Sequence, residues 1–395
     1  MVEMVPVILV LFVIAAFLRI DFYFKVVYFL AGTYLLMRFW SRKALAHLYA
    51  ERRFVDRAFP GEQVAVTVSL ENKSWLPVPW VVVQESIPVQ LSAVFQREVL
   101  ALGPYERRSF AYTLHCLRRG YYDVGPFNMR GGDLLGVQRP RTQQLPSQHI
   151  IVYPRVVPLE KLGLPTHSPL VALPARSPLF EDPARIMGVR DYQPGDSPRR
   201  IHWTATASTG RLLVKRYQPA VARETLICLD LDLSNYGFRR RLEAVELAIV
   251  TAASIANHIV TREGLAVGLA LEAWDPLLEQ EAHISLPPRR ERAHLMGILE
   301  VLARAQAVQN APPFAELLRK ESARLAWGAT ITIITGGESE GLFDTLLYLR
   351  RVGFTVALIL LMLESPPNEM QQQADMAGVP VHWIWREEDL EIWSD

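Results

Sequence analysis

Two long apolar stretches at the start of the chain constrain its fold more than any other feature. Met4–Leu18 is almost uninterrupted, and Phe22–Trp40 is broken only by Lys25 and Arg38 near its ends. A helix needs about 20 apolar residues to cross a bilayer. Long Lys and Arg side chains near the ends of such a helix reach the headgroups. The sequence therefore predicts a two-helix transmembrane hairpin over residues 1–43.

A cleaved signal peptide followed by one anchor is the alternative for this region. It is disfavoured because Glu3 stands where a signal peptide has basic residues, and no small-residue cleavage site precedes the second stretch. Basic residues gather at and after the end of that stretch, namely Arg38, Arg42, Lys43, Arg52 and Arg53. The positive-inside rule then places the remaining chain in the cytoplasm. We expect a multi-pass protein of the cell (inner) membrane.

After the hairpin, the sequence shows the two-residue period of β-strands. Val64, Val66 and Val68 fall on one face of an expected strand, with polar residues between them. Short strands separated by turn signals predict a small β-sandwich over 54–154. A stretch rich in Pro, Leu and Ala without a clear period follows at 155–183. We interpret it as a linker.

From Thr225 onward, predicted strands and helices alternate. Leu226–Leu231 is a continuous apolar run of the kind found in buried parallel strands, and a long helix follows at Arg239–Arg262. Further strands are expected at 265–271, 330–334, 355–363 and 379–385, with helices between them. This alternation predicts a doubly wound, mostly parallel α/β sheet within 184–395. Any ligand site would lie at the carboxyl ends of the strands.

The stretch RDYQPGDSPRRIHWTATASTGRLLVKRY, residues 190–217, carries the most specific motif of the chain. It predicts a tight turn at Pro194–Gly195 and then a helix that begins at Ser197–Pro198. Gly210 is expected to end that helix, and a strand follows from Leu212.

Spaced residues of this stretch resemble the signature of domain-of-unknown-function family 58. The matching positions are Arg190, Tyr192, Pro194, Gly195, Asp196, Arg200, Ile201, Trp203, Gly210, Leu212 and Val214. His202 and Thr204 depart from the signature, since members often carry an acid and a lysine there. More weakly, the resemblance extends to a membrane hairpin, a β-rich segment and a von Willebrand factor A-like domain. It implies a membrane-anchored, non-enzymatic adaptor or scaffold, because such proteins are commonly associated with MoxR-type AAA+ ATPases in assembling or maturing protein complexes.

The signature also predicts an interface with a protein partner. Its candidate interaction residues are Arg190, Tyr192, Pro194, Gly195, Asp196, Arg199, Arg200, His202 and Trp203. Arginines beside an exposed aromatic ring are typical interface anchors. A hydrolase built on Asp196, His202 and Ser208 is an alternative, but no nucleophile elbow supports it. We therefore expect no enzyme activity.

Asp230, Asp232 and Ser234 close the first expected strand of the α/β sheet. Alternating oxygen ligands at such an edge are able to hold Mg²⁺. The pattern resembles the metal-ion-dependent adhesion site of von Willebrand A domains, Asp-x-Ser-x-Ser, with Asp232 at the first serine. The later family aspartate is missing, and Thr335 or Glu338 is the candidate substitute. Two alternatives follow: a metal-dependent protein-binding receptor, or carboxylates that only cap the next helix.

Composition argues against other functional classes. A net charge of +1 gives no overall field for nucleic acid, and basic residues are not interleaved with aromatic ones as in a nucleic-acid reader. Cys116 and Cys228 lie far apart, and the chain has no CxxC, HExxH or P-loop motif. We expect no nucleic-acid partner, no small-molecule substrate and no cofactor besides the Mg²⁺ considered above.

Overall fold

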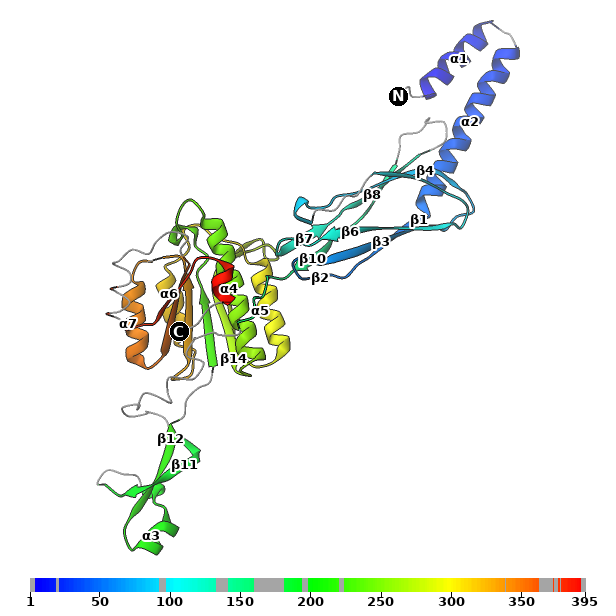
Figure 1. The fold of residues 1–395 in the computed structure, drawn as a ribbon. Coiled ribbons are helices and arrows are strands. Elements are labelled where there is room, and N and C mark those ends of the chain that lie inside the picture. The colour runs from blue at the N-terminus through cyan, green and yellow to red at the C-terminus, as the bar shows by residue number, and fades with distance from the viewer. Residues whose placement is uncertain are drawn as a thin grey trace. The chain divides into compact units, whose positions relative to one another are not determined.

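The protein is described by a computed structural model, which covers residues 4–18, 21–91, 97–132, 141–159, 181–193, 198–219, 224–337, 339–361, 372, 376 and 378–391. The chain forms two compact units, Met1–Arg155 with Leu302–Arg304 and Val156–Val301 with Ala305–Asp395. It is a mixed α/β protein with several helices and a mixed parallel and antiparallel sheet, which confirms the predicted fold class at this level (Figure 1).

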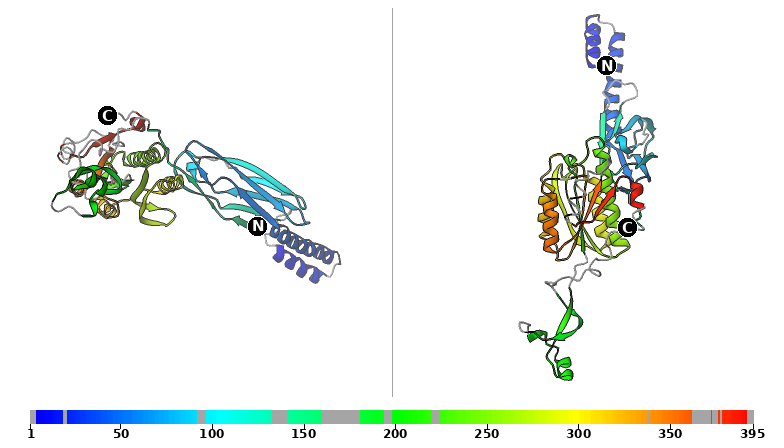
Figure 2. Two further views of the ribbon diagram at one scale, coloured as in Figure 1. Left: turned by 90° about the horizontal axis from the view of Figure 1, so that it is seen from below. Right: turned by 60° about the vertical axis from the view of Figure 1, so that its left-hand side comes forward.

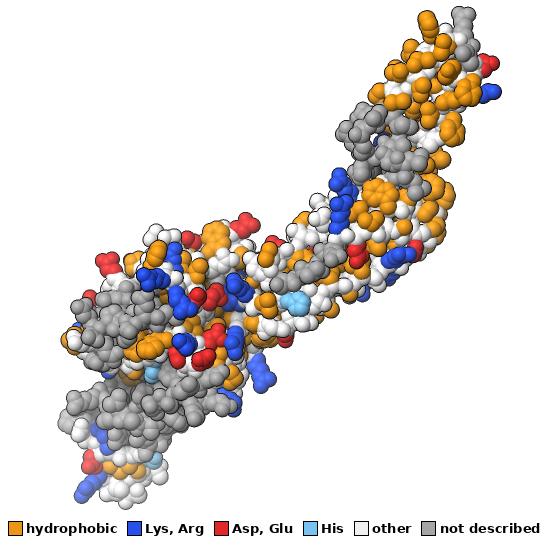
Figure 3. Space-filling model, turned by 45° about the horizontal axis from the view of Figure 1, so that its top comes forward, with side chains coloured by type: hydrophobic (Ala, Val, Ile, Leu, Met, Phe, Trp, Pro, Cys, Tyr) orange, Lys and Arg blue, Asp and Glu red, His pale blue; other side chains and the backbone are white. Residues whose placement is uncertain are grey.

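The first unit opens with two helices, α1 (Met4–Leu18) and α2 (Asp21–Ala46). They lie side by side, and the rings of Phe12 and Phe24 meet edge to face with centroids 6.2 Å apart (Figure 1). Many of their apolar side chains are exposed, and Figure 3 shows them as an orange covering over both helices. These are Val5, Val7, Leu9, Val10, Phe12, Val13, Ile14, Phe17, Leu18, Phe22, Tyr28, Phe29, Leu35, Leu36 and Phe39.

One helix in the described part of the chain is long and apolar enough to cross a membrane by length and composition, and it lies in the second unit. This helix is α4 (Arg241–Thr261), but 78% of its most apolar window is buried inside the protein. α4 is therefore a core helix. In the first unit, α1 is apolar but has only 15 residues, whereas α2 has 26 residues and includes charged ones.

A β domain follows α2 directly. Its strands are β1 (Leu48–Arg53), β2 (Arg57–Ala58), β3 (Gln63–Asn72), β4 (Val78–Glu85), β5 (Glu98–Leu102), β6 (Arg107–His115), β7 (Gly120–Val124), β8 (Phe127–Gly131), β9 (Arg141–Leu145) and β10 (Gln148–Val152). They form sheets in the orders β1-β3-β6, β2-β10-β7 and β5-β4-β8-β9. The alternation predicted for Val64, Val66 and Val68 is present, because β3 buries every second residue. The sheets share one apolar core.

Arg52, one of the basic residues that follow the second apolar stretch, is buried in the β domain. Its guanidinium pairs with Glu85 inside the β domain, and the Tyr112 hydroxyl donates to the same carboxylate. A buried charge is strongly disfavoured unless it is paired and hydrogen-bonded. Arg52 is therefore neutralised internally, and it does not belong to the basic surface that marks the end of the second apolar stretch.

The signature stretch forms a small antiparallel hairpin with a helix between its strands (Figure 1). β11 (Glu181–Asp191) pairs with β12 (Leu213–Pro219), with Asp191 opposite Leu213. Between them lie the 3-10 turn η3 (Pro198–Arg200) and the helix α3 (Trp203–Thr209). We call residues 181–219 the signature hairpin. Its first strand begins inside the stretch that the sequence predicted to be a linker.

The α/β sheet has six strands. In spatial order they are β15 (Gln280–Arg289), β14 (Ala266–Asp275), β13 (Glu224–Leu229), β16 (Thr330–Thr335), β17 (Thr355–Leu361) and β18 (Val381–Ile384). Only β15 is antiparallel to its neighbour among these pairs. The sequence prediction missed β15, because its two prolines and polar residues are typical of an edge strand rather than a buried one.

Helices cover both faces of this sheet, as Figures 1 and 2 show. They are α4, α5 (Arg292–Arg304), α6 (Phe314–Ser322), α7 (Leu342–Val352) and the short α9 (Glu387–Glu391). The chain runs from β13 to β14 on one side and later to β16 on the other side. The strand order therefore reverses between β13 and β16, which is where doubly wound sheets place their ligand sites.

Candidate functional site

The carboxyl ends of β13 and β16 bring several predicted site residues together. Asp230 follows β13, and Thr335 ends β16 beside it. The Thr335 hydroxyl donates to Asp230 Oδ2 at 2.7 Å, and both residues are buried. We call this cluster, with Asp232, Asn235 and Tyr236, the carboxyl-edge cluster. The predicted position of a site at the strand ends is thus occupied by polar side chains.

Asp230 accepts hydrogen bonds from three protein groups. Its Oδ1 accepts the backbone N–H of Asp232 at 3.0 Å, and its Oδ2 accepts the Asn235 side-chain amide at 2.8 Å in addition to Thr335. Burial raises the pKa of Asp230 to about 6, although these hydrogen bonds stabilise the charged form and oppose the shift. The carboxylate therefore holds the loop after β13 against the end of β16.

Asp232 connects two loops in the same way. Its Oδ1 accepts the backbone N–H of Ser234 at 2.9 Å, as a cap of the 3-10 turn Leu233–Asn235. The same carboxylate accepts the backbone N–H groups of Asn310 at 3.2 Å and Ala311 at 2.9 Å. An Asp that caps a turn is the alternative that the sequence left open. The geometry agrees with that alternative.

This donor set does not fit the predicted magnesium ion. The oxygens of Asp230 and Asp232 already receive protein hydrogen bonds, whereas Mg²⁺ requires oxygens that face the ion in octahedral geometry. Thr335 directs its hydroxyl proton to Asp230, and Glu338 lies outside the described residues. Within the described ranges no group of three or more His, Cys, Asp and Glu residues is placed to hold a metal.

Two glycines close the carboxyl-edge cluster from the side of β16. The buried Tyr236 donates its hydroxyl to the Asp230 carbonyl at 2.6 Å, and its ring fills the space beside Gly336. A Cβ on Gly336 would overlap that ring, and one on Gly337 would lie 2.8 Å from the Asn235 carbonyl oxygen. No role was predicted for these glycines from the sequence. Paired glycines directly after a buried strand are the signal that indicates such a close approach.

In the signature hairpin, α3 begins at Trp203 and not at the predicted Pro198. Ile201 pairs with Val214, and the His202 backbone N–H donates to the Leu213 carbonyl at 2.8 Å, so this segment lies along β12 before the helix starts. His202 Nδ1 then accepts the Ala205 backbone N–H at 3.1 Å as the N-cap. The predicted stop is confirmed, because Gly210 has φ 68° and closes the helix.

The hydrolase constellation is not assembled in the described part of the hairpin. His202 Nδ1 is engaged in the cap, and the Ser208 hydroxyl donates to the Ala205 carbonyl at 3.0 Å. Asp196, like Pro194 and Gly195, lies outside the described residues. The cap also gives a reason for the departure from the signature, since a ring nitrogen and the acid that members often carry are both acceptors for a helix N-terminus.

The signature hairpin presents an exposed surface that is rich in aromatic, aliphatic and basic residues. Trp203 is 67% exposed, and α3 buries none of its residues. Tyr192 and His202 are half-buried. The exposed apolar and basic residues near Trp203 in the sequence include Val189, Arg190, Arg200, Arg211 and Leu212, and the acidic Asp191 is exposed as well. Of the other predicted interaction residues, Arg199 belongs to η3, and its side chain lies outside the described atoms.

Comparison with known proteins identifies the family of this segment. Residues 188–347 match the family model described as a protein of unknown function, DUF58. This segment belongs to the DUF58 family. The resemblance found in the signature is therefore confirmed, and the DUF58 segment includes both the carboxyl-edge cluster and most of the signature hairpin.

Other similarities are more distant. The uncharacterized protein YeaD of Bacillus subtilis (strain 168) is 24% identical over 318 residues, which cover 79% of this chain and 75% of that protein. A CARDB domain from Pyrococcus furiosus matches with a TM-score of 0.20 and 17% identity, covering 27% of this chain and 91% of that one. A β-glucosidase from Listeria innocua matches with a TM-score of 0.18 and 14% identity, covering 27% and 16%.

Proposed function

We propose that the protein is a non-enzymatic adaptor of the cell (inner) membrane that works with a MoxR-type AAA+ ATPase in assembling or maturing protein complexes. The observation that carries this proposal is the exposed surface of the signature hairpin. Trp203 is 67% exposed, exposed arginines lie close to it in the sequence, and this combination is typical of an interface anchor. The ATPase is the partner that the family resemblance implies.

The two N-terminal helices support membrane anchoring. Exposing apolar surface to water costs about 25 cal/mol of free energy per Å² relative to burying it. A bilayer removes this cost, because the lipid chains are apolar. Phe17, at 88% exposure, and Phe29 represent a set of exposed apolar side chains that runs along both helices. Arg42 and Lys43 follow the apolar part of α2, as the positive-inside rule expects on a cytoplasmic side. The soluble domains then lie in the cytoplasm.

The strand arrangement supports a von Willebrand A-like fold for the α/β domain. Taking β13 as the first strand of this domain, the order is 3-2-1-4-5-6, and the third strand is antiparallel. The sequence Asp230-x-Asp232-x-Ser234 follows the first strand at the carboxyl edge. We do not extend the likeness to a metal-dependent receptor, because protein donors already occupy both carboxylates.

The non-enzymatic part of the proposal is supported by how the polar groups are used. The carboxyl-edge cluster satisfies its own hydrogen bonds, and Asp230, Tyr236 and Thr335 are buried rather than open to a substrate. His202 and Ser208 serve as local contacts of α3. These groups hold local structure, whereas the exposed Trp203 and Arg200 of the hairpin are available to a partner.

Capture of the ATPase from native membranes tests this proposal. The full chain, tagged at one end, is used as bait with and without ATP, and bound proteins are identified by mass spectrometry. Arg200→Ala combined with Trp203→Ala should reduce ATPase recovery about 30-fold or more, since a hot-spot residue contributes about 2 kcal/mol or more. A wild-type bait that captures no AAA+ ATPase in either condition rejects the proposal.

The matched control removes a second exposed aromatic and arginine pair. Phe238, which is 83% exposed, has the Arg241 guanidinium 5.4 Å from its ring centroid, in the loop that follows the carboxyl-edge cluster. Phe238→Ala with Arg241→Ala should leave ATPase capture unchanged. Loss of capture in this control, with capture retained in the Arg200 and Trp203 variant, would move the interface to the carboxyl edge of the sheet.

A further inference from the structure

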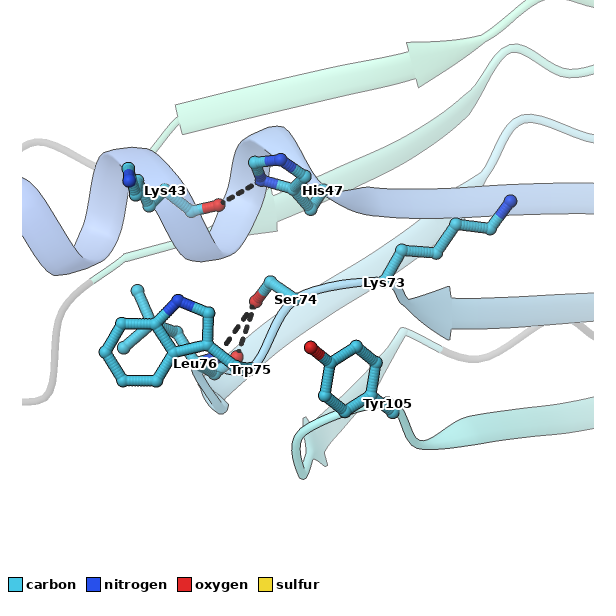
Figure 4. A pocket seen from close by; sticks show the side chains of 7 residues that line it. All are labelled: Lys43, His47, Lys73, Ser74, Trp75, Leu76 and Tyr105. Carbon is cyan, nitrogen blue, oxygen red and sulfur yellow. Dashed lines mark hydrogen bonds between the residues drawn. The ribbon is translucent and has the colours of Figure 1, made fainter.

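A pocket of about 150 Å³ lies in the first unit, where α2 reaches the β domain. Figure 4 shows that its walls come from three segments: the last turns of α2, the loop between β3 and β4, and the turn before β6. The lining residues are Lys43, His47, Lys73, Ser74, Trp75, Leu76 and Tyr105. None of them belongs to the DUF58 segment or to the surfaces discussed above.

Asn72 builds the frame of this pocket. Its side chain is fully buried, and its Nδ2 donates to the Leu76 and Gly103 carbonyls, both at 2.8 Å. Its Oδ1 accepts the Ser74 backbone N–H at 3.1 Å. One amide group thus fixes both ends of the β3–β4 loop and ties this loop to the turn before β6. An Asn with its hydrogen bonds satisfied in this way makes a preformed wall.

Backbone hydrogen bonds join the same three segments. The Lys73 N–H donates to the His47 carbonyl at 2.9 Å, which links the loop to the end of α2. The Tyr105 N–H donates to the Ser74 carbonyl at 3.2 Å, which links the turn to the loop. The position of the pocket along α2 is therefore fixed by the fold of this unit.

Two lysines flank the pocket, and Figure 4 shows their ammonium groups at its opposite outer ends. Lys43 Nζ lies 5.0 Å from the Phe39 ring centroid, and Lys73 Nζ lies 4.4 Å from the Tyr49 ring centroid. Among the described residues, no carboxylate forms an ion pair with either lysine. Cations that lie over rings at an exposed site keep most of their charge for an anionic ligand.

The depth of the pocket follows from Trp40. The apolar stretch of α2 ends at this residue, and Trp residues prefer the membrane interface. A helix rises 1.5 Å per residue, so Lys43 lies about 5 Å beyond Trp40 along α2, and His47, directly after the helix, lies about 10 Å beyond it. The headgroup layer on each side of a bilayer is about 5–7 Å thick. Lys43 therefore lies at headgroup level.

The Pro77 end of the β3–β4 loop lies at the level of Trp40. Trp40 Nε1 donates to the Pro77 carbonyl at 3.0 Å, so this end of the loop is beside the boundary of the apolar stretch. Trp75, only two residues earlier, is 63% exposed, and Tyr105 across the pocket is 70% exposed. Exposed Trp and Tyr rings beside lysines are the composition of a membrane–water interface.

We propose that this pocket binds the phosphate of an anionic phospholipid, with Lys43 and Lys73 providing the positive charge and Trp75 and Tyr105 lying among the headgroups. The bound lipid would fix the depth and tilt of α2 and thereby the orientation of the β domain on the membrane. This inference rests on the membrane anchoring in the proposed function. It does not depend on the ATPase partner.

Lipid binding to the purified full chain tests the proposal. The protein is kept in detergent and titrated with phosphatidylglycerol or with phosphatidylcholine of the same acyl chains, and bound lipid is counted by native mass spectrometry. Wild type should bind phosphatidylglycerol more tightly. Lys43→Gln with Lys73→Gln should weaken that binding about 25-fold, about five-fold for each lysine, and leave phosphatidylcholine binding unchanged.

Two further variants separate the site from general charge and from misfolding. Arg319→Gln with Lys320→Gln removes the same charge from two exposed positions on α6 and should keep the wild-type preference. Lys43→Arg with Lys73→Arg keeps the positive charge of the pocket. This variant should also keep the wild-type preference for phosphatidylglycerol. Equal affinity for the two lipids in wild type, or equal weakening by the α6 variant, overturns the proposal.

Two more measurements distinguish the lipid site from a free-phosphate site and from the membrane anchor. Inorganic phosphate, added at the concentration of the lipid, should not displace phosphatidylglycerol. Full displacement would make this a site for free phosphate and would reject the lipid. Alkaline carbonate extraction of cell membranes tests the anchor separately. If the chain stays in the membrane but Lys43→Gln with Lys73→Gln retains wild-type lipid affinity, the lipid site is refuted and the anchor is not. If carbonate releases the chain, the anchor is refuted.

Discussion

The carboxyl-edge cluster and the signature hairpin belong to the same DUF58 segment but use their polar residues in opposite ways. In the cluster, Asp230 and Asp232 are buried, and each accepts three hydrogen bonds from the protein. In the hairpin, α3 buries none of its residues, and Trp203 and Arg200 are exposed. The first region has its hydrogen bonds satisfied internally, and the second presents its side chains outward.

This difference indicates where a partner is expected to act. A buried polar group whose hydrogen bonds are satisfied contributes to the stability of the fold. Substituting it therefore mainly lowers the free energy of unfolding. An exposed aromatic ring contributes little to the fold and much to an interface. Substitutions in the two regions should therefore separate stability from binding, and the largest effect on stability is expected at the buried Asp230.

The pH dependence of stability should be dominated by Asp230. Its pKa rises from 3.8 to about 6 on folding, so between these values the folded chain holds a proton that the unfolded chain has lost. The free energy of unfolding should therefore fall by about 3 kcal/mol as pH rises from about 4 to about 6. Asp230→Asn removes this titration, and urea unfolding across that window should show a flatter profile. Parallel profiles for the two proteins would contradict the prediction.

Paired glycine substitutions compare the packing of the two regions. Gly336→Ala places a methyl group against the buried Tyr236 ring and should lower the free energy of unfolding by about 2 kcal/mol, the usual range for overpacking. Gly210→Ala meets no atom within 4 Å, but its positive φ of 68° should weaken α3 by about 1 kcal/mol. Urea unfolding measures the effect of Gly336→Ala on the free energy of unfolding. Hydrogen exchange of peptides from the signature hairpin measures the effect of Gly210→Ala on α3. Equal destabilisation by the two substitutions would contradict the expectation that the carboxyl-edge cluster is more tightly packed than the hairpin.

The sequence was sufficient for features that depend on periodicity. Val64, Val66 and Val68 alternate as predicted, and Gly210 ends α3. These features follow from local pattern, because side-chain period and a left-handed glycine act within a few residues. The resemblance to an adhesion site had named Thr335 as a candidate substitute at the same sheet edge, and Thr335 does lie against Asp230.

Features that depend on distant partners could not be predicted. The Arg52 charge is neutralised by Glu85, which is 33 residues away, and nothing in the sequence around Arg52 indicates this pairing. Asp232 is satisfied by Asn310 and Ala311, and nothing in the local motif distinguishes this from metal binding. The start of α3 moved because Ile201 pairs with Val214. In each case a long-range contact overrides a local preference.

The signature hairpin should tolerate loss of its anchors. Arg200→Ala with Trp203→Ala should change the free energy of unfolding by less than about 0.5 kcal/mol for each residue, because both side chains are exposed. The melting temperature of the full chain in detergent should stay at the wild-type value while ATPase capture is lost. A clear drop in melting temperature would assign these residues to the fold and leave the interface to be sought elsewhere.

Magnesium should have the smallest effect of all. A ligand that binds only the folded state stabilises it by RT ln(1 + [L]/Kd), so saturating Mg²⁺ at a real site would raise the melting temperature. The oxygens of Asp230 and Asp232 would first have to give up their protein hydrogen bonds, and we therefore expect no shift with Mg²⁺. Asp230→Ala with Asp232→Ala provides the control, since it removes both carboxylates. A rise in wild type that this variant abolishes would restore the adhesion-site interpretation, because the cluster would then rearrange around the ion. A rise that persists in the variant would place a magnesium site elsewhere in the chain and leave the carboxyl-edge cluster with a structural role.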